Sequence, residues 1–271
     1  MQAPVLVFDL ETTTDLTAGA HLHQLQDLSP ESTEMALNKL RRQESGNDFQ
    51  RLPLHEIVNI SGLWSDEHGI KLFSFSQADH DEAGLLTKFL SIFDKRRPTL
   101  ISWNGSQFDL PVILFRAMYH GLSAPALFDQ GEIDQRTRYN NYQNRYHHRH
   151  IDMMDVMSMF NNKNFQKLDA ISRLLGFPGK LGRETYRIPE YMQAAQWSTI
   201  MEDCEVDVLN TWLIYLRWLL LKGQITSTMH QQWIEQTHAY LLTQPQHQTF
   251  LADWQQMAAQ TPFSQFHSQE K

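Results

Sequence analysis

The chain has 271 residues, enough for one large domain with a substantial hydrophobic core. Its formal net charge of −8 argues against binding nucleic acid over the whole surface, although the distribution of charge matters more than its sum. The single cysteine, Cys204, excludes internal disulfides and cysteine-rich zinc sites. No basic segment leads into an apolar one near residue 1, and the most apolar later run, residues 212–221, is short and carries Arg217. We therefore predict a cytoplasmic protein without a membrane span.

The first predicted element is a buried strand that ends in two acids. Val5 to Phe8 are all apolar, and Asp9 and Glu11 follow, two positions apart. Because side chains alternate along a strand, both carboxylates would lie on the same face. Like charges repel at this spacing, and a divalent cation between them would make the arrangement favourable. The pattern therefore predicts an Mg²⁺ or Mn²⁺ site at the end of the strand.

A polar stretch follows, which we interpret as a helical insertion, at about 16–51, over the edge of the sheet. Three further strands are predicted at 56–64, 70–76 and 99–103, because these runs are apolar and rich in β-formers. The short polar turn between the first two of these strands ends in glycine, which predicts an antiparallel hairpin. Apolar residues recur at helical spacing on both sides of the last strand, at 81–96 and 109–121.

The second half is predicted to be mostly helical after one short strand at 148–152. Helices are indicated at 164–176, 194–223 and 226–242. Strands that alternate with helices indicate an α/β fold with a mixed sheet flanked by helices. We expect one domain over residues 1–223, with residues 224–271 forming a helical extension packed on it.

A second polar group follows the strand at 99–103. Asn104 and Gly105 would make a turn there, and Asp109 stands at the start of the next helix, two residues before Pro111. Asp109 could be only a helix cap, but a cap does not explain Asn104. If the strands are parallel, this turn lies beside Asp9, at the edge where α/β sheets usually bind ligands.

A third acidic position is Asp207, which lies in a strongly helical run between apolar neighbours. Asp203 is four residues earlier and therefore shares its face of the helix. Two acids at this spacing destabilise an isolated helix by roughly 0.2–0.5 kcal/mol. A bound cation would reverse the sign of that effect.

In this order, "FDLETT", "NGSQFD" and "CEVDV" resemble the three motifs of the DEDD, or DnaQ-like, superfamily of 3′-5′ exonucleases, whose fold is ribonuclease H-like. The chain most resembles stand-alone proteins similar to the proofreading domain of family B DNA polymerases, over residues 3–220, including the connector "LDAISRLLGFPGK". The resemblance implies two Mg²⁺ or Mn²⁺ ions held by four carboxylates, and a nucleic-acid substrate with a free 3′ end. These four are Asp9, Glu11, Asp109 and Asp207.

The same resemblance implies which residues would hold the terminal nucleotide. Leu10 and Thr12 would line its pocket, Asn104 would offer a polar amide there, and Phe108 would wedge or stack unless it is only a core aromatic. The implied activity is hydrolysis of phosphodiester bonds from the 3′ end of DNA or RNA, single-stranded in our prediction. No motif indicates a protein partner.

The third motif departs from the family pattern. A tyrosine four residues before the final aspartate, or a histidine five before it, usually orients or deprotonates the attacking water. Asp203 and Glu202 hold these positions here. Asp203 could accept the water's proton in their place. The alternative is a weakened or inactive protein that still binds nucleic acid.

Residues 136–150 contain four arginines and no acid. Arginines alternate there with tyrosines such as Tyr142 and Tyr146, a combination that can follow a single-strand backbone and stack on its bases. We therefore predict substrate contacts from Arg145 and Arg149, with a solvated loop as the alternative. The histidines 147, 148 and 150 do not have the spacing of a metal site, and Asp152 and Asp155 are interpreted as structural caps.

A phosphatase of the haloacid dehalogenase type is another alternative, because it also begins with a strand that ends in paired acids. That class would need a second aspartate where Glu11 stands. The exonuclease prediction therefore accounts for more of the sequence.

Overall fold

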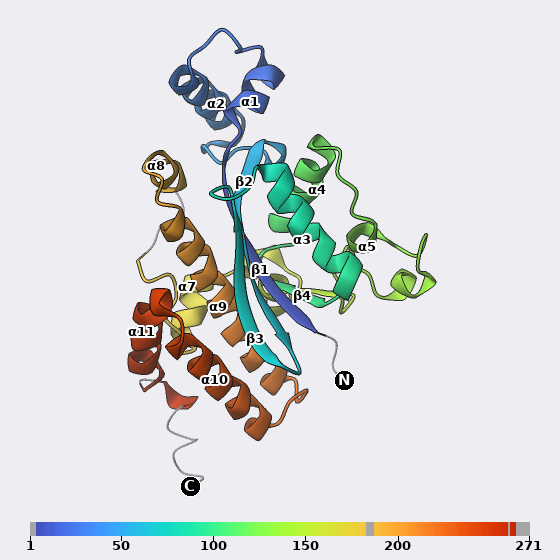
Figure 1. Ribbon diagram of the computed structural model, residues 1–271, viewed down its shortest axis with the longest axis vertical. Helices are drawn as coiled ribbons and strands as arrows, with labels where there is room; N and C mark the ends of the chain where they lie inside the picture. The colour runs from blue at the N-terminus through green and yellow to red at the C-terminus, as the bar shows by residue number, and fades with distance from the viewer. Residues whose placement is uncertain (1–3, 183–186, 260, 264–271) are drawn as a thin grey trace.

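A five-stranded mixed sheet forms the centre of the computed structural model, which describes residues 4–182, 187–259 and 261–263 (Figure 1). The strand order is β3-β2-β1-β4-β5. β1 pairs antiparallel with β2 and parallel with β4, while β2–β3 is antiparallel and β4–β5 parallel. The strands are β1 (Val5–Thr14), β2 (His55–Asp66), β3 (Gly69–Ser76), β4 (Thr99–Ser102) and β5 (His150–Asp152). The predicted α/β fold class is confirmed, as is the hairpin, where Asp66 pairs with Gly69.

Helices cover both faces of this sheet. Within the described residues, no helix is both long enough and apolar enough to cross a membrane. The helices are α1 (Leu16–His23), α2 (Pro30–Ser45), α3 (Glu82–Arg96), α4 (Asp109–Tyr119), α5 (Pro125–Phe128), α6 (Met153–Met157), α7 (Leu168–Leu174), α8 (Ile188–Gln193), α9 (Trp197–Leu221), α10 (Ser227–Leu242) and α11 (Gln248–Ala258).

Alternation along β1 divides its side chains between two cores. The even positions, such as Leu6 and Phe8, pack with α3 and α4. The odd positions, Val5 and Val7, pack with α9 on the other face. The odd series continues into both acids of the strand, so their carboxylates point to the side of the sheet that α9 covers. Burial of the apolar residues of β1 thus fixes the face of the sheet on which the acidic side chains lie.

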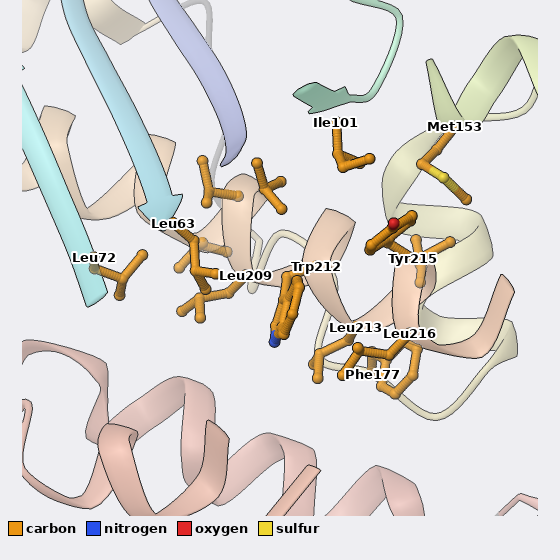
Figure 2. Close-up of a cluster of buried hydrophobic side chains, with 14 of the residues drawn as sticks. Leu63, Leu72, Ile101, Met153, Phe177, Leu209, Trp212, Leu213, Tyr215 and Leu216 are labelled. Atoms are coloured by element: carbon orange, nitrogen blue, oxygen red, sulfur yellow. The ribbon is translucent and has the colours of Figure 1, made fainter. Parts of the chain in front are cut away.

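The core on the α9 side, part of which is drawn in Figure 2, extends into the C-terminal helices. Trp212 of α9 is fully buried, and its indole N–H donates to Thr237 Oγ1 of α10 at 3.0 Å. The Trp212 and Trp233 rings are 5.3 Å apart between centroids. Phe250 and Trp254 of α11 belong to the same core. Of the predicted extension, residues 260 and 264–271 lie outside the described residues.

The insertion forms the two helices α1 and α2, but our prediction of its place was wrong. Figure 1 shows them beyond the ends of β1 and β2, whereas the edge strands of the sheet are β3 and β5. The reason is connectivity: the chain leaves β1 at Thr14 and returns through a 3₁₀ turn, Leu52–Leu54, into β2. β1 continues past Asp9 and Glu11 to Thr14, so the acids lie within the strand and not at its end, where we had predicted them, and the insertion stands beyond them.

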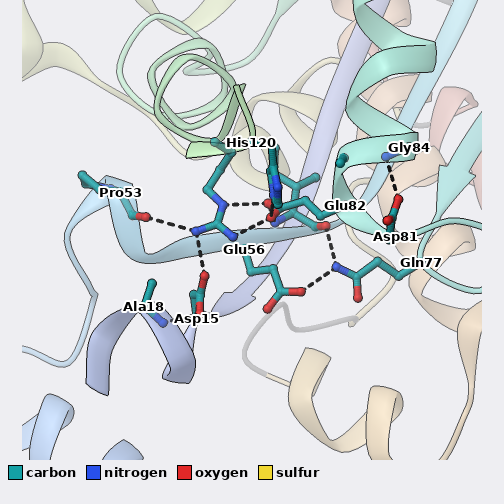
Figure 3. Close-up of polar contacts among 12 residues, drawn as sticks. Asp15, Ala18, Pro53, Glu56, Gln77, Asp81, Glu82, Gly84 and His120 are labelled. Carbon is teal, nitrogen blue, oxygen red and sulfur yellow. Dashed lines mark hydrogen bonds and ion pairs between the residues drawn. The ribbon is translucent and has the colours of Figure 1, made fainter. Parts of the chain in front are cut away.

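A buried ion network ties the insertion to the body (Figure 3). Arg116 of α4 is 2% exposed, and its Nη1 lies 2.8 Å from Asp15 Oδ2, the residue that caps α1. Its Nε donates to Glu82 Oε1 of α3 at 2.8 Å. Glu82 also accepts from the backbone N–H of Ile57 at 2.7 Å and contacts His120 at 2.6 Å. Removing one partner of such a buried pair costs about 3–5 kcal/mol.

Candidate active site

The structure brings the four acids of the three motifs into one cavity of about 590 Å³. Asp9 and Glu11 come from β1, Asp109 from the first turn of α4 and Asp207 from the middle of α9. Asp109, Glu11 and Asp207 are buried, at 2%, 4% and 7% exposure. Three segments that lie far apart in the chain thus meet only in the folded protein.

Local backbone features place these carboxylates. The β1–β2 register shifts between Glu11 and Thr12, a bulge of the kind that re-aims side chains beside active sites. Asn104 has a left-handed φ of 67°, and its backbone N–H donates to Asp152 Oδ1 at 2.8 Å. A Cβ on Gly105 would lie 2.2 Å from Ser102 Oγ, so only glycine fits there. The turn is therefore held in place before Asp109 begins α4.

Burial and mutual repulsion make the four acids hard to ionise. Burial raises the pKa of Asp9 and of Glu11 well above the usual range, and the neighbouring carboxylates raise both further. Burial and the charge of Asp152 raise the pKa of Asp109 to about 8. Burial also raises the pKa of Asp207, although the ammonium group of Lys180 opposes this shift. A divalent cation would favour the ionised form of all four.

The donor set fits hard divalent cations. Asp109 Oδ1 and Asn104 Oδ1 are buried and have no hydrogen-bond partner among the described residues. Such orphaned oxygens are rare in folded proteins, and carboxylate oxygen is the ligand type that Mg²⁺ and Mn²⁺ prefer. Asp9, Glu11 and Cys204 also offer atoms within 4.8 Å of one another. Cys204 is fully buried, and burial raises the pKa of its thiol.

Asp203 lies on α9, one turn before Asp207, and is buried. Its charge raises the pKa of Glu11 and of Asp207, so it is within electrostatic reach of both. Among the residues that the structure describes, however, it is not part of the cavity lining.

Lys180 is a residue of the cavity that our sequence analysis did not single out. Its Nζ lies 2.5 Å from Asp207 Oδ2, and these opposite charges raise the pKa of the lysine. The only signal in the sequence was its place at the end of the connector "LDAISRLLGFPGK", which resembles the family as a segment rather than as a site.

Aromatic rings form one wall of the cavity. Phe108 lies 5.1 Å from His55 and 5.8 Å from Phe49 between ring centroids. Leu10 and Thr12 line the cavity as well, and Thr12 Oγ1 is 2.9 Å from His55 Nδ1. Burial lowers the pKa of His55. Our sequence-based prediction did not include Phe49 or His55. The signal that could have indicated Phe49 is that it is a lone aromatic residue at the end of a polar insertion.

The basic tract does not reach this cavity in the described structure. Arg145 is paired with Asp155 and lines a separate cavity of about 430 Å³, while Arg149 donates to the carbonyl of Arg97 at 3.1 Å. Tyr142, expected to stack on bases, is instead buried and donates to the carbonyl of Pro98 at 2.7 Å. It was misinterpreted because composition does not reveal which member of an aromatic tract packs inward.

The histidines and acids next to the tract are structural. His150 is buried and lies 2.8 Å from Ser102 Oγ, and His147 accepts from the backbone N–H of Asn141. Asp152 caps α6, as predicted. Across the described ranges, the one group of side chains that could hold a metal contains no histidine.

A mixed sheet with two carboxylates on its central strand, facing one carboxylate on a long helix and one at the start of another, is the arrangement of a DEDD exonuclease domain with the ribonuclease H-like fold. The chain belongs to the family of predicted 3′-5′ exonucleases related to the exonuclease domain of PolB, whose model matches residues 47–258. The predicted resemblance is confirmed. The matched stretch begins after Asp9 and Glu11, so the first motif rests on the structure and the sequence pattern.

Similarity to a solved polymerase structure supports the fold. The family B DNA polymerase from the hyperthermophilic archaeon Pyrobaculum calidifontis matches with a TM-score of 0.54 and 18% identity, over 81% of this chain and 25% of that one. The chain thus spans about a quarter of the polymerase's length. A structure of exonuclease I matches with a TM-score of 0.34 and 14% identity, over 81% of this chain and 41% of that one. A search of curated protein sequences gave no match.

Proposed function

We propose that this protein is a metal-dependent 3′-5′ exonuclease that removes nucleotides from the free 3′ end of single-stranded DNA or RNA. One observation carries the proposal: four carboxylates from three distant segments, three of them buried, converge on one cavity in a protein of an exonuclease family. The predicted cytoplasmic location remains a prediction, supported by the single buried cysteine.

Asp9, Glu11, Asp109 and Asp207 would hold two Mg²⁺ or Mn²⁺ ions. Such a pair supplies an activated water and stabilises the leaving 3′ oxygen. The protein's own part is to fix the four carboxylates on β1, α4 and α9 and to shield Glu11, Asp109 and Asp207 from bulk water. Carboxylates held in place before metal binding need little rearrangement during the reaction.

The terminal nucleotide would lie against the cavity wall formed by Leu10, Thr12, Asn104 and Phe108. Phe108 offers a ring face for a base, and the unpartnered Oδ1 of Asn104 offers an acceptor. Contacts of Arg145 and Arg149 with the substrate backbone are a weaker part of the proposal, since both side chains already have partners in the protein.

An inactive nucleic-acid-binding protein is the second candidate, and one observation favours it. Asp203 and Glu202 stand where the family usually has its tyrosine or histidine. A digestion panel separates the two candidates: 5′-labelled single-stranded, duplex and 3′-blocked DNA and RNA, each with Mg²⁺, Mn²⁺ or chelator. We expect a ladder of shortened products only with metal and an open 3′ end, and none from Asp9→Asn. Equal products from the wild type and Asp9→Asn would reject the exonuclease proposal, and binding without products would establish the second candidate.

Asp203 is proposed as the substitute base. If it accepts the proton of the attacking water, Asp203→Asn should lower the single-turnover rate on one oligonucleotide by on the order of 10²–10⁴, the usual contribution of a general base. Asp203→Tyr, which restores the family residue, is the matched variant. A negligible loss in Asp203→Asn would reject the assignment, and a gain in Asp203→Tyr would identify the aspartate as a tolerated replacement.

A further inference from the structure

Lys180 forms the closest ion pair of the acidic cavity, and the proposed function leaves it without a role. We propose that Lys180 is a built-in cation of the site, which neutralises Asp207 while no divalent ion is bound and is displaced when an ion binds. The inference rests on the proposed metal-dependent function and adds a competitor for the metal within the chain itself.

The ammonium group occupies the place that suits a cation. Its distance of 2.5 Å from Asp207 Oδ2 is that of a direct charge-assisted contact. Its charge also acts on Asp9 and Glu11 and partly offsets the repulsion among the three acids. The Lys180 side chain is 32% exposed and the Asp207 side chain 9% exposed, so the lysine is the more solvent-accessible partner of the pair.

The backbone before Lys180 is fixed so that its side chain reaches the site. Asn210, fully buried, lies three residues after Asp207 on α9. Its side chain accepts from the Gly179 N–H at 3.0 Å and donates to the Gly179 carbonyl at 2.9 Å. The Lys180 N–H donates to Asp169 Oδ1 at 2.8 Å. Gly179 has φ of 70°, and a Cβ there would lie 2.3 Å from Asp169 Oδ1. The turn is thereby anchored to the helix that carries Asp207, while the four-carbon stem remains able to rotate.

An ammonium group and a divalent ion compete for Asp207, because two cations in contact with one carboxylate repel each other in a partly dry cavity. The contact of the ammonium group with Asp207 therefore weakens binding of the divalent ion by some factor. Removing the ammonium group should tighten metal binding by that same factor. Once displaced, the ammonium would still lie in the cavity where substrate enters, and a phosphate oxygen is the anion that it would meet there.

The test is titration of the 271-residue chain with Mn²⁺ by isothermal calorimetry, after removal of metal with chelator. We expect Lys180→Met to bind Mn²⁺ at least about fivefold more tightly than the wild type, the lower end of usual coupling strengths. Lys180→Arg, which keeps the charge, should stay within about twofold of the wild type. Lys167→Met is the matched control, because Lys167 lines the same cavity from an exposed position. It should change the affinity less than Lys180→Met.

Thermal unfolding supplies a readout that requires no turnover. In chelator, Lys180→Met should melt below the wild type, and saturating Mn²⁺ should raise its melting temperature more than that of the wild type. Equal or weaker Mn²⁺ binding by Lys180→Met, or the same gain in Lys167→Met, would overturn the inference while leaving the exonuclease proposal intact. A wild type that binds no Mn²⁺ would overturn both.

Discussion

Asp109 couples protonation to stability in one side chain, and the proposed metal ions would act on both. It is 2% exposed, one of its oxygens has no partner among the described residues, and its pKa is raised to about 8. The unfolded chain would ionise the same carboxyl near pH 3.8. Because the folded state holds this proton more tightly than the unfolded state, protonation of Asp109 stabilises the fold. This stabilisation is at its full size below the pKa of the unfolded chain and is lost as the pH rises through the pKa of the folded protein. The metal-free protein should therefore weaken as the pH approaches 8.

We expect the melting temperature of the metal-free wild type to fall between pH 6.5 and 8, and Asp109→Asn to show a smaller fall. The buried His55 and His150 do not affect the slope in this pH window. Their pKa values are lowered in the folded protein, so they increase stability only until the pH reaches the unfolded-state value of about 6.5. Thermal unfolding in chelator at several pH values measures both slopes. Equal slopes in the two proteins would show that Asp109 is ionised throughout.

Sequence reasoning at the residue scale found the acids but not their partners. Asp9, Glu11, Asp109 and Asp207 stood out because each interrupts an apolar pattern in a way that folding alone does not require. Lys180 does not interrupt an apolar pattern, because a lysine in a polar turn is common. Its ion pair with Asp207 forms only when α9 packs beside the turn. Ion pairs between distant residues leave no periodic trace in a sequence.

At the scale of elements, the insertion contributes part of the cavity wall. α1 and α2 stand beyond the ends of β1 and β2, and the segment that returns from α2 brings Phe49 to within 5.8 Å of Phe108 between ring centroids. Phe49 is 54% exposed, so its ring is open to a base on one side. The insertion thus contributes a ring to the cavity wall besides its structural connection to the body.

Phe49→Ala should weaken binding of a single-stranded oligonucleotide by about 5- to 150-fold, because stacking of one base on an aromatic ring contributes roughly 1–3 kcal/mol. Fluorescence anisotropy in the Asp9→Asn background measures this without cleavage. Leu22→Ala, at an exposed position of α1, is the control and should bind as the background does. Unchanged affinity in the Phe49 variant would leave the aromatic wall as a structural feature only.

Long helices were predictable and the shortest helices were not. The helices α3, α4, α9 and α10 carry a 3.6-residue apolar pattern, and the strands, including the short β4 and β5, could be recognised as short runs set apart from the helical segments. α5, α6 and α8 have four to six residues, too few to show a period. The position of the insertion depends on where the strands that it joins lie in the sheet. Local sequence patterns do not determine the order of strands, so this position could not be predicted.

At the scale of the whole molecule, the C-terminal helices complete the core rather than decorate it. Trp212, Phe250 and Trp254 share one buried cluster, and α10 contacts both α9 and β3. The family model also runs through α11, to residue 258. The division at residue 223 remains a prediction, and the continuous core implies that residues 1–223 depend on α10 and α11 for their stability.

We expect a chain ending at residue 223 to aggregate or to lack a cooperative thermal transition, because it would expose the apolar face of α9. Each large side chain taken out of that core carries roughly 1.5–3 kcal/mol of burial. A chain ending at residue 259 retains α11 and is the control. Size-exclusion chromatography and circular dichroism melts compare the three proteins, and a shortened chain that melts within a few degrees of the full one would contradict the expectation.

The Arg116 network has a consequence for the order of folding. Arg116 bonds to Glu82, 34 positions earlier in the chain, and to Pro53, 63 positions earlier, as well as to Asp15 at the start of the insertion. Contacts that close such long loops form after the local elements have docked, so the network belongs to the late steps of assembly. Interactions made late are the first to open, and they govern the rate of unfolding more than the rate of folding. Partial opening would then release the insertion, together with Phe49, while the central sheet stays paired.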